Sequence, residues 1–163
     1  MRRPTVTNPY VIVGGGVAGV SAAEALRGAG FDGRVVLVGE EQEYPYQRPP
    51  LSKGLLRGEV APDFASLRSP AFYETNAIEL HLGDRVTRID PRARRVECAS
   101  GTRFEYNKLL VATGGMPRVL RVPGSDLPGI HYLRTLAQRS VCARSCSSIR
   151  TFWWWAVVSL VVR

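Results

Sequence analysis

The chain opens with the alternation of apolar and polar segments that a strand–helix–strand unit produces. Residues 10–13 form a short β-branched run that ends in glycines, and residues 34–38 form a second such run. Between them, residues 17–27 repeat apolar positions at helical spacing, and Gly28 and Gly30 stop the pattern. Short apolar runs bounded by glycine are typical of buried parallel strands. The segment therefore predicts a right-handed βαβ unit of the usual ~30-residue size.

A charged excursion and a β-meander follow this unit. Short helical patterns occupy residues 51–56 and 66–76, and the pattern predicts a further strand at residues 78–82. Between residues 85 and 113, alternating segments are separated by Asp-Pro and Ser-Gly turn signals. We expect these segments to form a meander that leads into one more buried strand.

The predicted fold class is α/β, a Rossmann-like domain with a parallel sheet and a β-meander. The last recognisable element lies at residues 131–135, and no periodicity is sustained beyond Ala137. With 163 residues and 45% hydrophobic composition, the chain can bury one core. We therefore expect one incomplete domain over residues 1–137 and an aberrant segment over residues 138–163.

Net charge is a poor guide to the partner of this chain. Its 22 Lys and Arg against 14 Asp and Glu give a formal charge of +8, but the basic residues are scattered among acids without a run. After Asp126 the chain carries only basic charge. The apolar stretch at residues 152–162 is about half the ~20 residues that a membrane-spanning helix needs. We expect neither a nucleic-acid partner nor a membrane anchor.

The three cysteines, Cys98, Cys142 and Cys146, are too few and too irregularly spaced for a disulfide framework. No histidine or second cysteine pair completes a zinc site around the last two. We expect no metal site, and a reducing cytoplasm is the natural compartment.

Gly14, Gly16 and Gly19 form a G-x-G-x-x-G sequence between the first predicted strand and the first predicted helix. In this position the first glycine makes a tight turn, the second admits a pyrophosphate, and the third lets helix and strand pack closely. Backbone N–H groups and the helix dipole then face the phosphates. A plain tight turn is the alternative, but the placement between strand and helix favours dinucleotide binding.

Glu40 follows the second predicted strand, about ~20 residues beyond the glycines, where an acid accepts hydrogen bonds from an adenosine ribose. Glu41 is the rival for this role. A solvated loop carboxylate is the alternative for both.

The stretch Arg48-Pro49-Pro50-Leu51-Ser52-Lys53 resembles the signature of the FAD-dependent reductases that serve ferredoxins of oxygenase systems. Two prolines fix the backbone, and Ser52 can cap a short helix that presents Lys53 inward. In that family the lysine sits near the flavin N5, where a cation stabilises the negative charge of the reduced ring. A surface lysine is the alternative.

The resemblance extends over residues 9–137 and includes the segments GDRVTRID, LLVATGG and YLRT. In the family the first contacts the adenine side, the second closes the domain over the cofactor, and the arginine of the third reaches the flavin phosphates or ring. The resemblance therefore implies FAD-binding roles, with Lys53 also catalytic, for Gly14, Gly16, Ala18, Gly19, Glu40, Arg48, Lys53, Val86, Ala112, Thr113, Gly114 and Arg134.

The function that this resemblance implies is NAD(P)H-dependent reduction of a ferredoxin or rubredoxin. NAD(P)H would pass hydride to the flavin, which gives single electrons to the iron–sulfur protein or rubredoxin. Disulfide reductases of the same superfamily carry a redox-active cysteine pair where this chain has Arg48–Lys53. Because the family's NAD(P) domain follows the YLRT segment, we expect this chain to lack that site, and a non-catalytic flavin-binding fragment or pseudogene product stays open.

The tail contains a tryptophan triplet, Trp153–Trp155, that indicates a change of reading frame. Tryptophan has a single codon, so reading from each third base forces Leu-Val-Val-Gly across Phe152 and the triplet. The remaining residues permit LVVGGGFIGxE, which resembles the start of the family's NAD(P) domain. We interpret the tail as frameshifted near Gln138. An authentic apolar tail for dimerisation or membrane contact is the alternative.

Overall fold

The computed structural model describes residues 8–147 and 160–161, which fall into two compact units. We call them the sheet unit, which contains Met1–Tyr46 and Ser66–Thr113, and the helical unit, which contains Gln47–Ala65 and Gly114–Arg163, each as far as it is described. The Trp153–Trp155 triplet lies outside the described residues. Among the described residues, no helix is long and apolar enough to cross a membrane.

The sheet unit is built on a four-stranded parallel sheet in the order β3-β2-β1-β7. Strand β1 (Tyr10–Val13) lies between β2 (Val35–Val38) and β7 (Lys108–Val111), and β3 (Ile78–His81) pairs with β2 on its other side. The predicted strands and the βαβ unit are confirmed. Strands β1 and β2 are apolar runs that the sheet buries almost completely. The expectation of a buried strand after the meander was wrong, because three of the four residues of β7 are exposed at the edge of the sheet.

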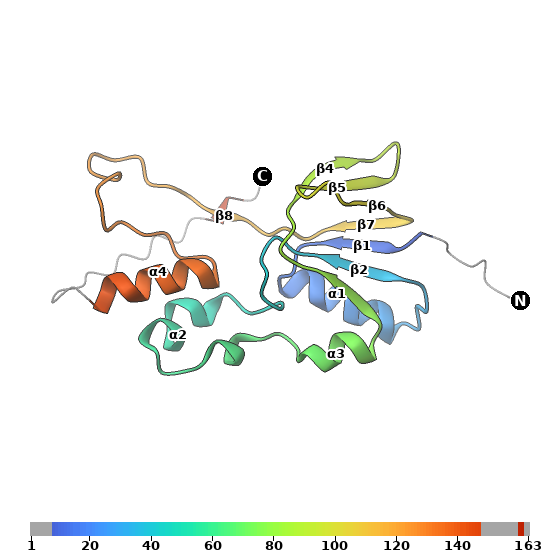
Figure 1. The fold of residues 1–163 in the computed structure, drawn as a ribbon, viewed down its shortest axis with the longest axis horizontal. Helices are drawn as coiled ribbons and strands as arrows, with labels where there is room; N and C mark the ends of the chain where they lie inside the picture. The colour runs from blue at the N-terminus through green and yellow to red at the C-terminus, as the bar shows by residue number, and fades with distance from the viewer. Residues whose placement is uncertain (1–7, 148–159, 162–163) are drawn as a thin grey trace, which may run out of the picture. The chain divides into compact units, whose positions relative to one another are not determined.

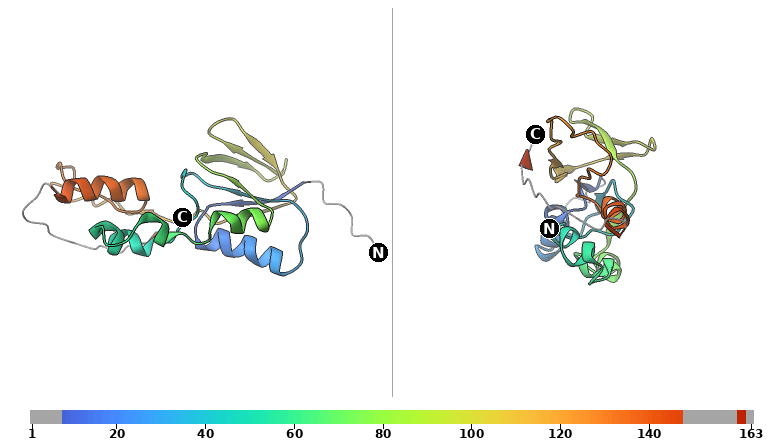
Figure 2. Two further views of the ribbon diagram at one scale, coloured as in Figure 1. Left: turned by 60° about the horizontal axis from the view of Figure 1, so that its bottom comes forward. Right: turned by 90° about the vertical axis from the view of Figure 1, so that its left-hand side faces the viewer.

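Alternate side chains of β1 and β2 enter two different cores, as the two-residue period of a strand requires. Val11, Val13, Val36 and Val38 pack with residues of the meander on one face. The intervening side chains, Ile12 among them, pack on the other face against α1 (Val17–Gly28) and α3 (Pro70–Thr75). Figures 1 and 2 show these two helices on one side of the sheet and the meander on the other.

The meander contains three antiparallel strands, β4 (Val86–Asp90), β5 (Arg95–Cys98) and β6 (Arg103–Glu105). The predicted Asp-Pro turn forms between the first two, where the Asp90 carboxylate accepts the backbone N–H of Arg92 at 3.0 Å and that of the next residue at 2.9 Å. The meander is therefore confirmed, together with the local reason for its first turn.

Arg27 has a structural role that the sequence did not indicate. At the end of α1 its guanidinium donates to the carbonyl oxygens of Phe31 and Gly33, each at 2.7 Å, and to those of Asn76 at 2.6 Å and Ala77 at 2.8 Å. These bonds join the end of α1 to the turn between α3 and β3. A single cation thus satisfies backbone acceptors of two segments that are distant in sequence.

The helical unit consists of short elements. Its first segment contains the 3-10 helix η1 (Pro49–Ser52), the one-turn helix α2 (Gly54–Arg57) and the 3-10 helix η2 (Pro62–Ala65). Its second segment contains β8 (Met116–Pro117), which pairs antiparallel with β9 (Leu160–Val161). The helical turns expected around residues 51–56 are confirmed.

One expectation for the second segment was wrong, because residues 131–135 form no regular element. Helix α4 (Leu136–Ser147) continues past Ala137 although its sequence has no amphipathic periodicity. The Gln138 side chain marks the start of this helix. Its Oε1 accepts the N–H of Thr135 at 3.1 Å, while the Gln138 N–H donates to Thr135 Oγ1 at 3.1 Å. This reciprocal pair is a capping box.

Candidate functional site

The turn after β1 holds Gly14 in a conformation that other residues rarely adopt. Its φ is +119°, and a Cβ added there would lie 2.2 Å from the carbonyl oxygen of Ala112. The Gly14 N–H donates to Val38 O at 2.8 Å, and the Ala112 N–H donates to Val13 O at 2.8 Å. The carboxyl ends of β1, β2 and β7 therefore fix this turn, and the position requires glycine.

Gly19 and Gly16 differ in the space around their Cα atoms: Gly19 is tightly packed and Gly16 is open. A Cβ on Gly19 would lie 2.0 Å from the carbonyl oxygen of Gly14, so α1 can pack this closely on the sheet only without a side chain there. A Cβ on Gly16 would meet no atom of the described chain within 4 Å. The second glycine of the motif thus faces open space, which is where a ligand can approach the backbone.

The N-terminus of α1 is open as well. Gly16 is the N-cap, so the helix start has no side-chain cap within the described chain, and no acidic residue lies in the first turn. Val17 and Ala18, the first two residues of the helix, are exposed. The first N–H groups of a helix have no acceptor within it, and the helix dipole adds partial positive charge. The arrangement can bind a phosphate.

Glu40 and Glu41, the two acidic residues that follow β2, have different interaction partners. Tyr46 donates a hydrogen bond to Glu41 Oε2, so the Glu41 carboxylate is used inside the unit. Glu40 has a side chain that is 65% exposed and forms a 3.7 Å ion pair with Arg85. Of the two, Glu40 is better placed to exchange its partner for a ribose hydroxyl.

The remaining candidate residues of the sheet unit are less informative. Val86, the first residue of β4, is half-buried and packs against the core beneath the meander. Thr113 is exposed at the end of β7, next to the Ala112 carbonyl that faces Gly14. Both positions are consistent with a role in cofactor binding and with a purely structural role.

The Arg48–Lys53 segment differs from its predicted geometry. Pro49 and Pro50 begin η1 as expected, but within the described chain Ser52 caps no helix, because Lys53 is itself the N-cap of α2. Lys53 is exposed rather than directed inward. Lys53 lies at the break between η1 and α2, where its φ is −123° and its ψ is −122°.

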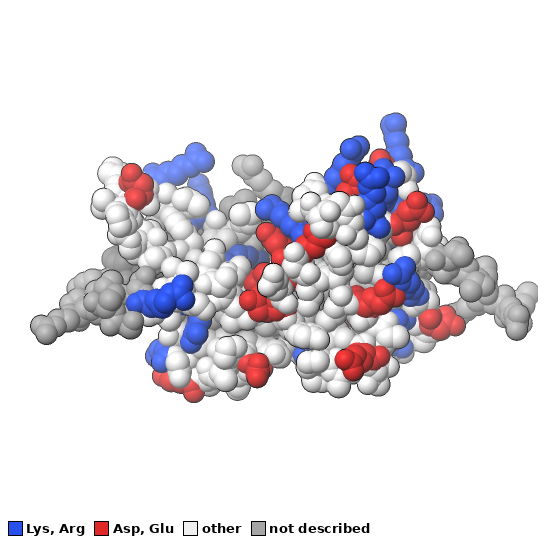
Figure 3. All heavy atoms as spheres, in the orientation of Figure 1, with Lys and Arg blue, Asp and Glu red and all other residues white. Residues whose placement is uncertain are grey.

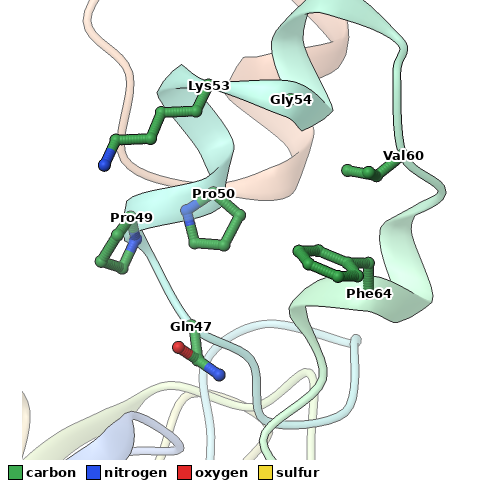
Figure 4. Close-up of a pocket in the computed structure, with 7 residues that line it drawn as sticks. All are labelled: Gln47, Pro49, Pro50, Lys53, Gly54, Val60 and Phe64. Carbon is green, nitrogen blue, oxygen red and sulfur yellow. The ribbon is translucent and has the colours of Figure 1, made fainter.

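Lys53 lines a pocket of about 220 Å³ within the helical unit. Figure 4 shows Lys53 and Pro49 on one side of it and Val60 and Phe64 on the other. The lining combines apolar surface with one cation and one amide, and its members are Gln47, Pro49, Pro50, Lys53, Gly54, Val60 and Phe64.

Three further candidate residues meet in the helical unit. Arg48 Nη1 donates to the carbonyl oxygen of Arg134 at 2.5 Å. Gly114 has φ +69°, and a Cβ added there would lie 2.9 Å from Arg134 Nη2. The structure thus brings Arg48, Gly114 and Arg134 together, while the glycine turn, Glu40, Val86, Ala112 and Thr113 belong to the sheet unit.

Acidic and basic side chains are mixed on the surface of the sheet unit, as the scattered charges in the sequence predict. Over the meander in Figure 3, acidic side chains lie among the basic ones. Arg95 and Arg103 each approach Glu97 at 3.3 Å. Part of the positive charge is therefore neutralised within the sheet unit.

Comparison with known proteins gives consistent matches. The family model described as pyridine nucleotide-disulphide oxidoreductase matches residues 8–149. Rhodocoxin reductase of Rhodococcus erythropolis is 45% identical over 142 residues, which cover 85% of this chain and 33% of that protein. A crystal structure of a ferredoxin reductase from Rhodopseudomonas palustris superposes with a TM-score of 0.78 at 41% identity, covering 85% of this chain and 34% of the other. The chain in a covalent putidaredoxin reductase–putidaredoxin complex has a TM-score of 0.76 at 35% identity, with coverage of 85% and 34%.

Proposed function

The chain belongs to the pyridine nucleotide-disulphide oxidoreductase family, and we propose that it binds FAD with the pyrophosphate on the glycine turn of the sheet unit. The observation that carries this proposal is the open space at Gly16 beside the uncapped start of α1. Backbone N–H groups in this position bind phosphate without needing a basic side chain. Gly14 and Gly19 supply the shape of the turn, and Gly16 together with Ala18 supplies the contact surface.

We assign the adenosine ribose to Glu40. Its exposed carboxylate follows the strand next to β1, and its ion pair with Arg85 is long enough to yield to a hydroxyl donor. The resemblance also assigns Val86 to the adenine side and Ala112-Thr113-Gly114 to the segment that covers the cofactor. Bidentate acceptance of ribose hydroxyls by such an acid is the usual arrangement in this type of turn.

Lys53, Arg48 and Arg134 are our proposed contacts to the flavin part of FAD. FAD, when bound, supplies hydride acceptance and single-electron transfer. The exposed Lys53 ammonium can then stabilise negative charge on the reduced ring. Arg48 holds the Arg134 carbonyl, and this bond positions the segment that carries the Arg134 guanidinium.

The activity that we propose for the whole protein is electron transfer from NAD(P)H through FAD to a ferredoxin-like or rubredoxin-like acceptor. The names of the matched relatives support it. So does the Arg48–Lys53 segment, which has no cysteine pair for disulfide chemistry. This chain spans 33% of the length of rhodocoxin reductase. A second candidate function is flavin binding without turnover, which the one Gly-rich turn between a strand and a helix of the described residues would suffice for.

Purification of the chain separates these functions. A yellow protein that reduces a dye with NADH supports the reductase. A yellow protein without dye reduction supports flavin binding alone. A folded but colourless protein that takes up no added FAD defeats both.

We propose the reducing cytoplasm as the compartment, because the buried Cys98 and Cys142 are not joined in a disulfide.

We also propose that the reading frame changes between Arg139 and Phe152. Two observations support a reading frame that is still correct at Gln138 and Arg139. Gln138 forms the capping box, and Arg139 Nε donates to Leu55 O at 2.8 Å. Sequencing the gene tests this proposal: an open overlapping frame that continues as LVVGGGFIGxE supports it, and a gene without such a frame contradicts it.

A further inference from the structure

His81, Asp84 and Cys98 converge in the sheet unit although they lie in different segments. His81 ends β3, Asp84 lies in the turn before β4, and Cys98 ends β5. His81 Nε2 lies 2.8 Å from Asp84 Oδ2, and one potential ligand atom from each of the three residues lies within 4.8 Å of the other two. A nitrogen, an oxygen and a sulfur donor are thus gathered in one place.

The cluster is held rigidly and keeps one open side. Asp84 is 8% exposed and Cys98 is 4% exposed. The Ser100 N–H donates to Asp84 Oδ1 at 3.1 Å, and Ser100 Oγ donates to Asp84 Oδ2. The His81 side chain is 33% exposed, so solvent reaches the cluster from its side. Fixed ligands, a supporting hydroxyl and an entry path are what a metal site requires.

The burial of the cluster suits a cation. Asp84 is a nearly buried carboxyl group that lies beside the buried Cys98 thiol. A divalent ion would compensate the buried negative charge and displace the thiol proton.

We propose that His81, Asp84 and Cys98 form a three-ligand site for a borderline-soft divalent cation such as Zn²⁺. Imidazole, carboxylate and thiolate are the three ligand types that this ion prefers, and a water completes a tetrahedral set. On binding, the Nε2–H···Oδ2 hydrogen bond is replaced by two bonds to the ion, which leaves His81 protonated at Nδ1. The Cys98 proton leaves to solvent, and Ser100 continues to hold Oδ1. The spacing of these three residues along the chain did not predict a metal site.

Cobalt titration of the purified chain, freed of metal by a chelator and kept reduced, tests this site. Co²⁺ replaces Zn²⁺ in such sites and reports a thiolate ligand by near-ultraviolet charge-transfer absorption. We expect this absorption to saturate at one equivalent and to vanish on addition of Zn²⁺. We expect it to be absent in Cys98→Ala and retained in Cys142→Ala, the matched control at the other buried thiol. No absorption from a folded chain overturns the proposal, and so does absorption that survives in Cys98→Ala.

His81→Gln serves where Cys98→Ala fails to fold. The amide can still donate to Asp84 and keeps the hydrogen-bonded loop, but it is a poor ligand for this ion. We expect the thiolate absorption to persist with at least ~tenfold weaker Co²⁺ affinity. Unchanged affinity in a folded His81→Gln overturns the proposal. Neither result depends on FAD, so this site can fail without affecting the proposed function.

Discussion

The two units of this chain differ in how completely they bury their own apolar surface. In the sheet unit, all four residues of β2 are buried, and β1 is covered by helices on one face and by the meander on the other. In the helical unit, Met116 is 74% exposed and Leu127 62%, and further large apolar side chains of its second segment are exposed as well. The sheet unit therefore holds most of the buried apolar side chains, although Val17 and Val111 are exposed there, whereas the helical unit leaves more apolar groups that a ligand or another segment can cover.

The difference in burial matters for function because the residues that we propose to bind FAD lie partly in the sheet unit and partly in the helical unit. The residues that we assign to pyrophosphate and ribose lie on the well-buried unit, whose backbone geometry is fixed by strand ends. The residues that we assign to the flavin lie on elements of only a few residues. We infer that the pyrophosphate contacts are preformed and that the flavin contacts become ordered with the cofactor.

The largest expected effect comes from Gly19→Ala. The new Cβ would meet the carbonyl oxygen of Gly14 at 2.0 Å, and this backbone atom cannot move without displacing the turn. We expect a loss of about ~3 kcal/mol or more in the free energy of unfolding, measured by urea denaturation. Gly28→Ala is the control, since a Cβ there meets no described atom within 4 Å and alanine favours a helix by up to ~1 kcal/mol. Equal stability of the two variants would contradict the packing described for α1.

Arg27→Met should have the next largest effect. It removes the donors to four carbonyl groups but keeps most of the apolar stem, and each of the three partly buried acceptors then carries a desolvation cost. We expect a loss of about 2 kcal/mol in the free energy of unfolding, measured by urea denaturation. Arg139→Met, which removes donors to Leu55 O in the helical unit, should cost less than half as much. A larger loss from Arg139→Met would reverse the order of stability that we assign to the two units.

Amide hydrogen exchange of the wild-type chain should show that the two units differ in local stability. Amides of α2 and α4 should exchange faster than those of β1 and β2, because local opening depends on buried contacts. Saturating FAD should slow exchange in the helical unit more than in the central strands. Uniform protection of both units before and after FAD addition would show that the contrast in burial has no consequence for dynamics.

Tyr73→Phe should have the smallest effect on stability at neutral pH, and the size of this effect depends on pH. The Tyr73 hydroxyl is buried and has no hydrogen-bond partner among the described residues, so its removal should leave stability at pH 7 unchanged or slightly higher. Burial raises the pKa of Tyr73 from 10.0 to about 12. The unfolded chain therefore ionises first, and stability is lost as the pH rises from 10 towards 12. Thermal melts of both proteins across this range should show a smaller alkaline loss in the variant, and identical losses would contradict the buried position.

The sheet unit could be predicted from sequence because its determinants are local. Short apolar runs, the glycines around residues 14–19 and the Asp90 turn each specify their own conformation. The helical unit was predicted less well. The start of α4 depends on one reciprocal pair of hydrogen bonds, and the exposed Lys53 lies between two short helices, η1 and α2, that the sequence did not separate.

The features that sequence reasoning missed entirely are long-range. Arg27 contacts carbonyl groups about fifty positions away, and His81 at the end of β3 lies close to Cys98 at the end of β5. No periodicity or motif marks such contacts before the register of the strands is known. Glu40 and Glu41 could likewise be separated only after Tyr46 was seen to bind one of them.

The central claim is that the glycine turn of the sheet unit binds FAD, and titration of the wild-type chain and of Gly16→Val with FAD tests it most directly. Gly16 has ordinary backbone angles and open space around it, so the variant should keep its fold, as judged by circular dichroism and thermal melting. We predict one bound FAD per wild-type chain and at least ~100-fold weaker binding by the variant, because its side chain occupies the position of the pyrophosphate. Equal FAD affinity of the two folded proteins, or no FAD binding by the folded wild type, would contradict the account.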